Sequence, residues 1–455
     1  MSLVLAGCAA ISGNQAHNAA SVARSPDQAP QAITIATPEQ AQDESDDIIA
    51  MSFSGGGWRA AAFSLGALQG LASLPGPSGR SLLKQVRFIT AVSGGSLTGA
   101  WVGLNGTDSL AEFRKIALLH GGKHELRSGL LNTVSLLRLA GDGLPAWLDD
   151  EVFHGATFSS MRNADHPVVW INATNLNQRL PFVFTRPTFD ALCSDLDTYP
   201  VADAVAASMA VPLVFSPVVL EKHPEQCATW LPKLSNGASS TSKATLLTDS
   251  TRSALTDYRD LDTGRYVKLV DGGLTDNFGL SSIPQMRLLT GSPLTPLSEA
   301  EALHVKRLMF IVVDGGRRPA VSWSRGIGGP GGFDLALASI DAAIDTNMRL
   351  SYDNFVSTSR QWQDDIVAWR CGRPDTEQEQ QRLRRANWRC DDVKVSIERI
   401  SFDSLPADRA QQLHAISTSL TLPPEDLDSV IAAGNDAARD SPIVQSFSSA
   451  QTTTR

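Results

Sequence analysis

The sequence predicts an α/β protein with a three-layer α/β/α fold around a mainly parallel central sheet. Short apolar runs that end in Gly, Asn or Asp recur along the chain, separated by helix-like segments. Nearly continuous apolar runs of this kind are typical of parallel strands that helices cover on both faces. The runs expected to be strands are residues 48–53, 86–92, 168–173, 266–270 and 308–313.

The composition excludes several classes of protein. Hydrophobic residues make up 42% and charged residues 19% of the 455 residues, which is typical of a globular protein with a sizeable core. With a net charge of −9 and no run of Lys or Arg, no nucleic-acid partner is expected. No apolar run reaches the roughly 18 residues that a membrane-spanning helix needs. The histidines are scattered and no CxxC spacing occurs, so no metal or other cofactor is expected.

The first residues, MSLVLAGCAA, resemble the lipobox of bacterial lipoproteins, in which the cysteine becomes residue one and is lipidated. Here Leu5, Ala6 and Gly7 precede Cys8, so residues 1–8 are interpreted as a truncated lipoprotein signal. The basic start and most of the apolar region of a signal peptide are missing. Two alternatives therefore stay open: a start placed too far downstream, or an ordinary apolar N-terminus. The lipoprotein interpretation implies a lipid anchor on a membrane surface of the bacterial envelope, facing the periplasm, with the outer membrane favoured.

Residues 9–47 are rich in Ala, Gln, Ser, Asn, Asp and Pro and predict a flexible linker. One catalytic domain is expected over residues 48–455, with its motifs in 48–316 and a C-terminal strand and helices in 317–455. In this last part we expect a long helix over about 333–355, a strand in VSIERISFDSL and a helix in LPPEDLDSVIAAGNDAARDSP. The Ser/Thr-rich segment 234–260 is expected to be a surface loop.

Four further cysteines form two local couples, Cys193 with Cys227 and Cys371 with Cys390. In an oxidising periplasm these couples would be disulfides, whereas in a cytosol they would be free thiols. Four cysteines can pair in three ways, so the pairing stays open.

Three turns of different chemistry follow three of the expected strands. The first, SGGGWR, places glycines 55–57 where a strand meets a helix, so that backbone N–H groups can bind an anion. The second has the shape of a nucleophile elbow, with Ser93 followed by Gly94 and Gly95. The third ends a strand at Asp271, whose carboxylate is expected at the same sheet edge, on a neighbouring parallel strand. A phosphate loop would need G-x-x-x-x-G-K-[ST] and a dinucleotide fold G-x-G-x-x-G, and the first turn is neither.

These turns resemble the motifs of the patatin-like phospholipases, in the same order. That family has a G-G-G-x-R/K turn, a G-x-S-x-G elbow, an A-S-x-x-x-P segment and a D-G-G/A turn. The matching residues are Gly55-Gly56-Gly57-Trp58-Arg59, Ala91-Val92-Ser93-Gly94-Gly95, Ala207-Ser208-Met209-Ala210-Val211-Pro212 and Asp271-Gly272-Gly273. The resemblance covers roughly residues 48–316, and its one departure is Ala91, where the family has glycine.

The resemblance implies a patatin-like fold and a serine acyl hydrolase that uses a Ser-Asp dyad without histidine. Carried over, Ser93 is the nucleophile and Asp271 the base, while the amides of glycines 55–57, with Arg59, form the oxyanion hole. The implied reaction is hydrolysis of carboxylic esters of phospholipids, lysophospholipids or acylglycerols through an acyl-serine intermediate. A lipid substrate is then the expected partner, and no cofactor is required.

Two other functions stay open. The same acyl-serine could pass its acyl group to an acceptor other than water, which would make the protein an acyltransferase. Alternatively, the chain could be a catalytically silent envelope lipoprotein that acts as a binding module. A Ser-His-Asp triad would need His304 or His414, and neither follows a strand-end turn. The sequence does not set the head group, the chain length or the oligomeric state.

Individual residues also have alternative interpretations. A second Asp-Gly-Gly begins at Asp314, but Asp271 is favoured because DGGLTDNFG matches the text that follows the family's aspartate. Asp276 and Asn277 are expected to cap the turn after it. Arg59 could serve the oxyanion, a lipid phosphate or only the fold.

Overall fold

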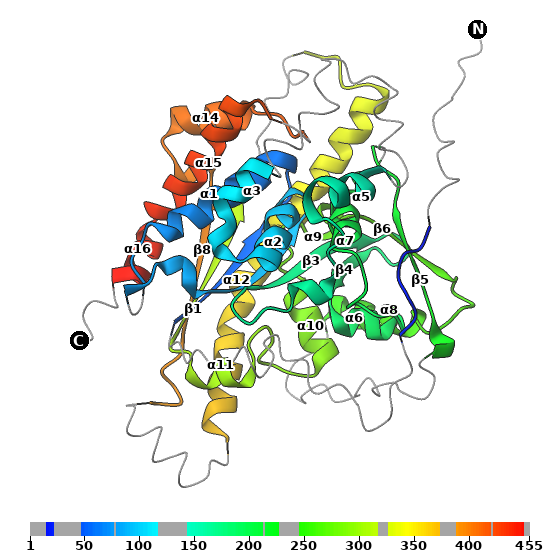
Figure 1. Cartoon of the computed structure of the whole chain (residues 1–455), viewed down its shortest axis with the longest axis horizontal. Coiled ribbons are helices and arrows are strands. Elements are labelled where there is room, and N and C mark those ends of the chain that lie inside the picture. The colour runs from blue at the N-terminus through cyan, green and yellow to red at the C-terminus, as the bar shows by residue number, and fades with distance from the viewer. Residues whose placement is uncertain are drawn as a thin grey trace.

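One eight-stranded sheet forms the centre of the molecule (Figure 1). The computed structural model describes residues 15–21, 47–76, 79–116, 143–212, 214–226, 245–316, 326–373, 388–419 and 422–449. The strand order is β5-β6-β3-β2-β1-β7-β8, with β4 beside β3. The strands are β1 (Asp47–Phe53), β2 (Val86–Val92), β3 (Val168–Asn175), β4 (Leu180–Phe184), β5 (Val218–Glu221), β6 (Tyr266–Asp271), β7 (Arg307–Asp314) and β8 (Lys394–Ser401).

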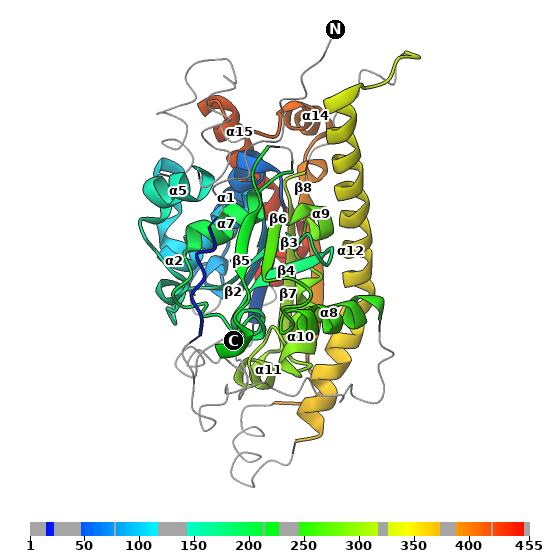
Figure 2. The same cartoon turned by 90° about the vertical axis from the view of Figure 1, so that its right-hand side faces the viewer.

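Helices cover both faces of this sheet, which confirms the predicted three-layer α/β/α fold (Figure 2). In β1, Ile49, Met51 and Phe53 face the layer that contains α1 and α2, whereas Ile48 and Ala50 face the layer that contains α10 and α12. The helices are α1 (Gly57–Ala72), α2 (Gly94–Asn105), α3 (Leu110–Phe113), α5 (Gly143–Leu148), α6 (Arg186–Ala191), α7 (Val201–Met209), α8 (Leu246–Asp257), α9 (Gly273–Asp276), α10 (Ser282–Thr290), α11 (Glu299–His304), α12 (Gly332–Cys371), α14 (Ala407–Ala415), α15 (Pro424–Arg439) and α16 (Pro442–Ser449).

The sheet is parallel from β3 through β2, β1 and β7 to β8, but β4, β5 and β6 are antiparallel to the strands beside them. The prediction that Asp271 ends a parallel neighbour of the Ser93 strand is therefore wrong. β2 stops where Val92 pairs with Asn172, and β3 continues for three more residues. β6 runs back along this extension and ends where Asp271 pairs with Ala173. Because β4 occupies the other edge of the extension, the C-terminal ends of β2 and β6 meet head-on along one edge of β3.

The C-terminal residues complete the same layers. β8 pairs with β7 in parallel. α15 packs directly on α1, because a Cβ at Gly66 would lie 2.0 Å from the Ile431 carbonyl oxygen and a Cβ at Gly434 would lie 2.2 Å from that of Phe63. Glycines at these positions let the two helix backbones approach closely. The long helix α12 extends well beyond the predicted residue 355, to Cys371.

Part of the predicted flexible linker is ordered against the domain, so that prediction is wrong for residues 15–21. Asn18 is 6% exposed, and its side-chain amide donates to the Glu221 carbonyl oxygen and accepts from the Glu221 N–H, both at 2.8 Å. The His17 ring lies 2.6 Å from Asp203 of α7. Ala16 forms a parallel bridge with Val219 of β5. These contacts cover the edge strand of the sheet, which would otherwise expose unpaired backbone groups. We call residues 15–21 the N-terminal strap.

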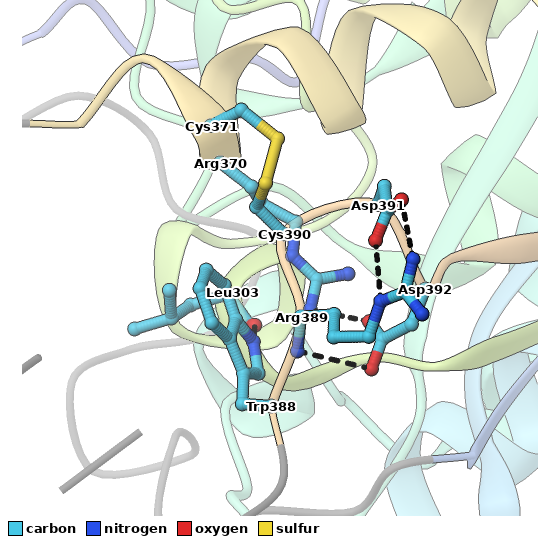
Figure 3. Close-up of a disulfide and its surroundings, with 8 residues drawn as sticks. All are labelled: Leu303, Arg370, Cys371, Trp388, Arg389, Cys390, Asp391 and Asp392. Atoms are coloured by element: carbon cyan, nitrogen blue, oxygen red, sulfur yellow. Dashed lines mark hydrogen bonds and ion pairs between the residues drawn. A yellow bond between two sulfur atoms is a disulfide. The ribbon is translucent and has the colours of Figure 1, made fainter. Parts of the chain in front are cut away.

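A disulfide and an ion pair connect the end of α12 to the residues that precede β8 (Figure 3). Cys371 and Cys390 form a disulfide. Beside it, the buried Arg370 guanidinium donates to Asp392 at 3.0 Å and lies over the Trp388 ring. Of the other couple, Cys193 is also in a disulfide, and Cys227 lies outside the described residues.

The segment expected as a Ser/Thr-rich loop contains α8, whose start the side chains of Thr245 and Thr248 cap reciprocally. In this capping box, threonine occupies the third helical position, where Glu or Gln is usual. The sequence therefore did not predict the start of α8. Among the described residues, no helix is long and apolar enough to cross a membrane.

Candidate active site

Ser93 lies on a sharp turn between β2 and α2, as predicted for a nucleophile elbow. Its φ of 48° and ψ of −125° lie in a region that residues with a side chain rarely adopt, at a cost of roughly 1–3 kcal/mol. Gly94 and Gly95 make this turn possible, since a Cβ at Gly94 would lie 1.9 Å from the Gly57 carbonyl oxygen and one at Gly95 would lie 2.6 Å from that of Phe53. The two glycines therefore allow the elbow to pack directly on the backbone of β1 and of the glycine turn.

The Ser93 hydroxyl faces the Asp271 carboxylate at the point where β2 and β6 meet. The Ser93 Oγ donates to Asp271 Oδ2 at 2.8 Å, and the other carboxylate oxygen accepts from the Gly273 N–H at 2.8 Å. Ser93 is 6% and Asp271 5% exposed. This geometry suits proton transfer from the hydroxyl to the carboxylate.

Burial raises the pKa of the Asp271 carboxyl from its ordinary value of 3.8 to about 6, although hydrogen bonds from Gly273 and Ser93 act in the opposite direction. A carboxylate with an ordinary pKa is a poor base for a hydroxyl, and loss of solvent around the charged form strengthens it. Burial thus makes the Asp271 carboxylate a stronger base than an exposed one.

The pKa of Asp271 leads to a prediction for the pH profile. With Asp271 as the base, only the ionised carboxyl is active, so kcat/KM for a neutral ester should rise as the pH increases through about 6 and then level off. The measurement is kcat/KM for a p-nitrophenyl ester between pH 4.5 and 8.5. A profile that is flat down to pH 4.5 would exclude Asp271 as the titrating base.

Ser208 of α7 supports the elbow, a role that the sequence analysis did not assign to it. The Ser93 N–H donates to the Ser208 hydroxyl at 2.7 Å, and that hydroxyl donates to the Asn172 carbonyl oxygen at 2.5 Å. The Ser208 and Ala210 carbonyl oxygens accept from the N–H groups of Gly272 and Asp271. The A-S-x-x-x-P segment therefore joins the elbow to the aspartate turn. The presence of this segment among the family motifs was the one indication in the sequence that Ser208 belongs to the site.

The glycine turn between β1 and α1 lies beside the elbow, but only part of it is free to bind an anion. Gly56 and Gly57 have φ values of 138° and 62°, which glycine adopts readily. Among the described residues, neither of their N–H groups has a hydrogen-bond acceptor. The Gly55 N–H, in contrast, donates to the Asn277 carbonyl oxygen at 3.2 Å. Of the three predicted oxyanion donors, the Gly55 amide is therefore already engaged, and its bond to Asn277 connects the glycine turn to the aspartate turn.

Arg59 lies buried next to the glycine turn. Its side chain is 1% exposed, and its Nε donates to the Gly315 carbonyl oxygen at 3.0 Å. Its Nη1 donates to the Ile416 carbonyl oxygen at 2.8 Å and to Thr418 Oγ1 at 3.2 Å. These hydrogen bonds hold the guanidinium between the residue after β7 and residues 416–418.

The alternative site residues have structural partners. Asp314 is paired with Arg399 of β8 at 2.6 Å, and this pair joins β7 to β8 away from Ser93. His414 lies 3.1 Å from Asp403 in the C-terminal region. The Asp276 carboxylate accepts from the N–H groups of Phe278 and Ser281, as a turn cap does.

Cys8, the predicted site of lipidation, lies outside the described residues. Within the described residues, no group of three His, Cys, Asp or Glu side chains could hold a metal ion.

A small hollow lies between the N-terminal strap, α5 and the residues that follow α7. Gln15 and His17 line it together with Ala206, Ala210 and Phe215, and it also touches α5. Ala210 links this hollow to the aspartate turn, since its carbonyl oxygen accepts from the Asp271 N–H.

The fold and this site define an α/β protein with a buried serine-carboxylate pair and two free backbone amides at one edge of the sheet. A family model described as patatin-like phospholipase matches residues 51–283, just over half of the chain. The chain belongs to the patatin-like phospholipase family.

No curated protein sequence matches the chain. Among solved structures, human GIVD cytosolic phospholipase A2 is similar at 12% sequence identity and a TM-score of 0.41, over 89% of this chain and 59% of that one. The chain thus spans about three fifths of the length of that structure.

Proposed function

We propose that this protein is a serine acyl hydrolase that cleaves carboxylic esters of phospholipids, lysophospholipids or acylglycerols. The observation that carries the proposal is the buried 2.8 Å hydrogen bond from Ser93 Oγ to Asp271 Oδ2, beside the free amides of the glycine turn. Membership in the patatin-like phospholipase family supports a lipid ester as the substrate class.

In the first half of the reaction, Asp271 takes the hydroxyl proton as Ser93 Oγ attacks the ester carbonyl carbon. The carbonyl oxygen becomes an anion, and the N–H groups of Gly56 and Gly57 stabilise it. Removing one such donor typically costs about 2.7–4 kcal/mol of transition-state stabilisation. When the tetrahedral intermediate collapses, the ester C–O bond breaks and the leaving alkoxide takes the proton from Asp271.

In the second half, water hydrolyses the acyl-serine. Asp271, ionised again, accepts a proton from the water as its oxygen attacks the acyl carbon, and the same two amides hold the oxyanion. Collapse releases the fatty acid, and the proton returns to Ser93 Oγ. The pKa of about 6 makes Asp271 both a usable base and a usable acid in this cycle.

We further propose that Cys8 carries a lipid anchor and that the enzyme acts in the bacterial envelope, facing the periplasm. The Leu-Ala-Gly-Cys start supports the anchor, and the disulfide between Cys371 and Cys390 supports an oxidising compartment. Metabolic labelling with an alkyne fatty acid, comparing the full chain with Cys8→Ser, tests the anchor independently of catalysis. Equal labelling of both proteins would exclude Cys8 as the site of lipid attachment.

Lipid-product mass spectrometry tests the reaction itself. Incubation of the wild-type protein with mixed phospholipid, lysophospholipid and diacylglycerol micelles should release free fatty acid from at least one class. Added glycerol or lysolipid should leave the yield of fatty acid unchanged for a hydrolase. Acyl transfer to the added acceptor in place of fatty acid would identify a transferase, and the absence of both products and of fluorophosphonate labelling would indicate a silent binding module.

A further inference from the structure

The C-terminal part of the chain reaches back to the glycine turn of the active site. Residues 416–419 follow α14 and lie far outside the matched family region, which ends at residue 283. The Ser419 carbonyl oxygen accepts from the Trp58 N–H at 2.9 Å, directly after the turn. A Cβ at Gly57 would lie 2.5 Å from the same oxygen. The segment therefore packs on the backbone that carries the two free amides.

Arg59 ties this segment to the core of the sheet. Through Nε it binds Gly315, which directly follows β7, and through Nη1 it binds Ile416 and Thr418. A rigid guanidinium fork can hold two backbone segments at a fixed separation, which the flexible ammonium of lysine cannot do. The side chain is buried, so these bonds form away from competing water.

The glycine turn needs external support of this kind. Gly56 and Gly57 have no side chains to pack and adopt φ values that leave the backbone little local restraint. An oxyanion hole is effective only when its donors stay within tenths of an ångström of the developing charge. On either side of the two amides, the Gly55 N–H donates to the Asn277 carbonyl oxygen and the Trp58 N–H donates to that of Ser419.

We propose that residues 416–419, held by Arg59, form a latch that sets the position of the Gly56 and Gly57 amides. Arg59 is then a positioning residue of the oxyanion hole that contacts neither the oxyanion nor a lipid phosphate. The inference rests on the proposed acyl hydrolase function and adds that the C-terminal segment contributes to the rate of the chemical step.

The test compares Arg59→Gln, Arg59→Lys and Thr418→Val in the full chain. Each is assayed on a neutral p-nitrophenyl ester and on a phospholipid, with kcat expressed per active site titrated by a fluorophosphonate. We expect kcat per active site to fall about 10- to 100-fold for both Arg59 variants on both substrates, because a misplaced donor loses transition-state stabilisation. KM should change little. Thr418→Val, which removes one of the bonds and leaves Arg59 in place, should show the same pattern with a smaller loss.

Two matched controls remove similar contacts elsewhere. Arg409→Gln breaks an ion pair with Asp436 between α14 and α15, and Thr256→Val removes a hydroxyl bond within α8. Both should keep the wild-type kcat per active site. A rise in KM for the phospholipid alone, with recovery in Arg59→Lys, would overturn the proposal in favour of phosphate binding. Fewer titratable sites with an unchanged kcat per site would show that Arg59 serves only the fold. If Ser93→Ala stays active, the proposed function itself fails.

Discussion

Replacing Ser93 with alanine is expected to abolish ester hydrolysis, with kcat lower by about 10⁴-fold or more. The hydroxyl is the only group of the buried pair that can form the acyl intermediate, so Asp271 and the two amides are left without a nucleophile. The fold should survive, because the close backbone contacts at Gly94 and Gly95 do not involve the serine oxygen. The measurements are hydrolysis of a short p-nitrophenyl ester, labelling by a fluorophosphonate, and thermal unfolding.

Ser73→Ala is the matched control for this prediction. The Ser73 hydroxyl donates to the Gly70 carbonyl oxygen at the end of α1, so its loss removes a hydrogen bond without touching the site. It should retain wild-type activity and labelling. Full activity in Ser93→Ala, measured with protein free of host esterases, would refute the serine mechanism.

Replacing Asp271 with asparagine is expected to remove nearly as much activity and, at neutral pH, to stabilise the fold. The activity falls because the amide cannot accept the proton of Ser93. The stability rises because the native state of the wild type holds a buried charge. The folded pKa of about 6 lies above the ordinary 3.8, so the carboxyl favours folding fully below about pH 4 and loses that contribution as the pH rises through about 6. The difference amounts to at most about 3 kcal/mol at pH 8.

Urea unfolding at pH 4 and pH 8 measures this effect. The wild type and Asp271→Asn should have similar free energies of unfolding at pH 4, and the variant should be the more stable at pH 8. Asp314→Asn serves as the comparison, because that carboxylate is also buried but is paired with Arg399. It should keep most of the activity and lose stability. If Asp314→Asn lost activity and Asp271→Asn kept it, Asp314 would be the base.

The parts of the site that depend on neighbouring residues could be predicted from the sequence. The elbow at Ser93 follows from glycines one and two positions later, and the strand before it from a continuous apolar run. The direction of β6 could not be predicted in this way, because a short apolar run looks the same in parallel and antiparallel pairing. Proximity of Ser93 and Asp271 was inferred correctly from the motifs, while the reason offered for it, a parallel neighbour, was wrong.

The contacts of Arg59 show a second limit. Its partners Gly315, Ile416 and Thr418 lie more than 250 residues away in the chain, so no local pattern indicates them. The same holds for the N–H of Gly55, whose acceptor follows the aspartate turn. Which amides of a glycine turn are free depends on the tertiary contacts of their neighbours, and the motif alone does not contain that information.

The docked N-terminal strap changes the distance over which an anchored enzyme could work. If Cys8 carries the lipid, a linker that stayed free as far as β1 would have a contour length of roughly 140 Å. Docking at Gln15 leaves only residues 9–14 between the anchor and the folded protein, and these span at most roughly 25 Å. The enzyme would then search only the leaflet to which it is attached, and the hollow that Gln15 and His17 help to line would remain near that surface.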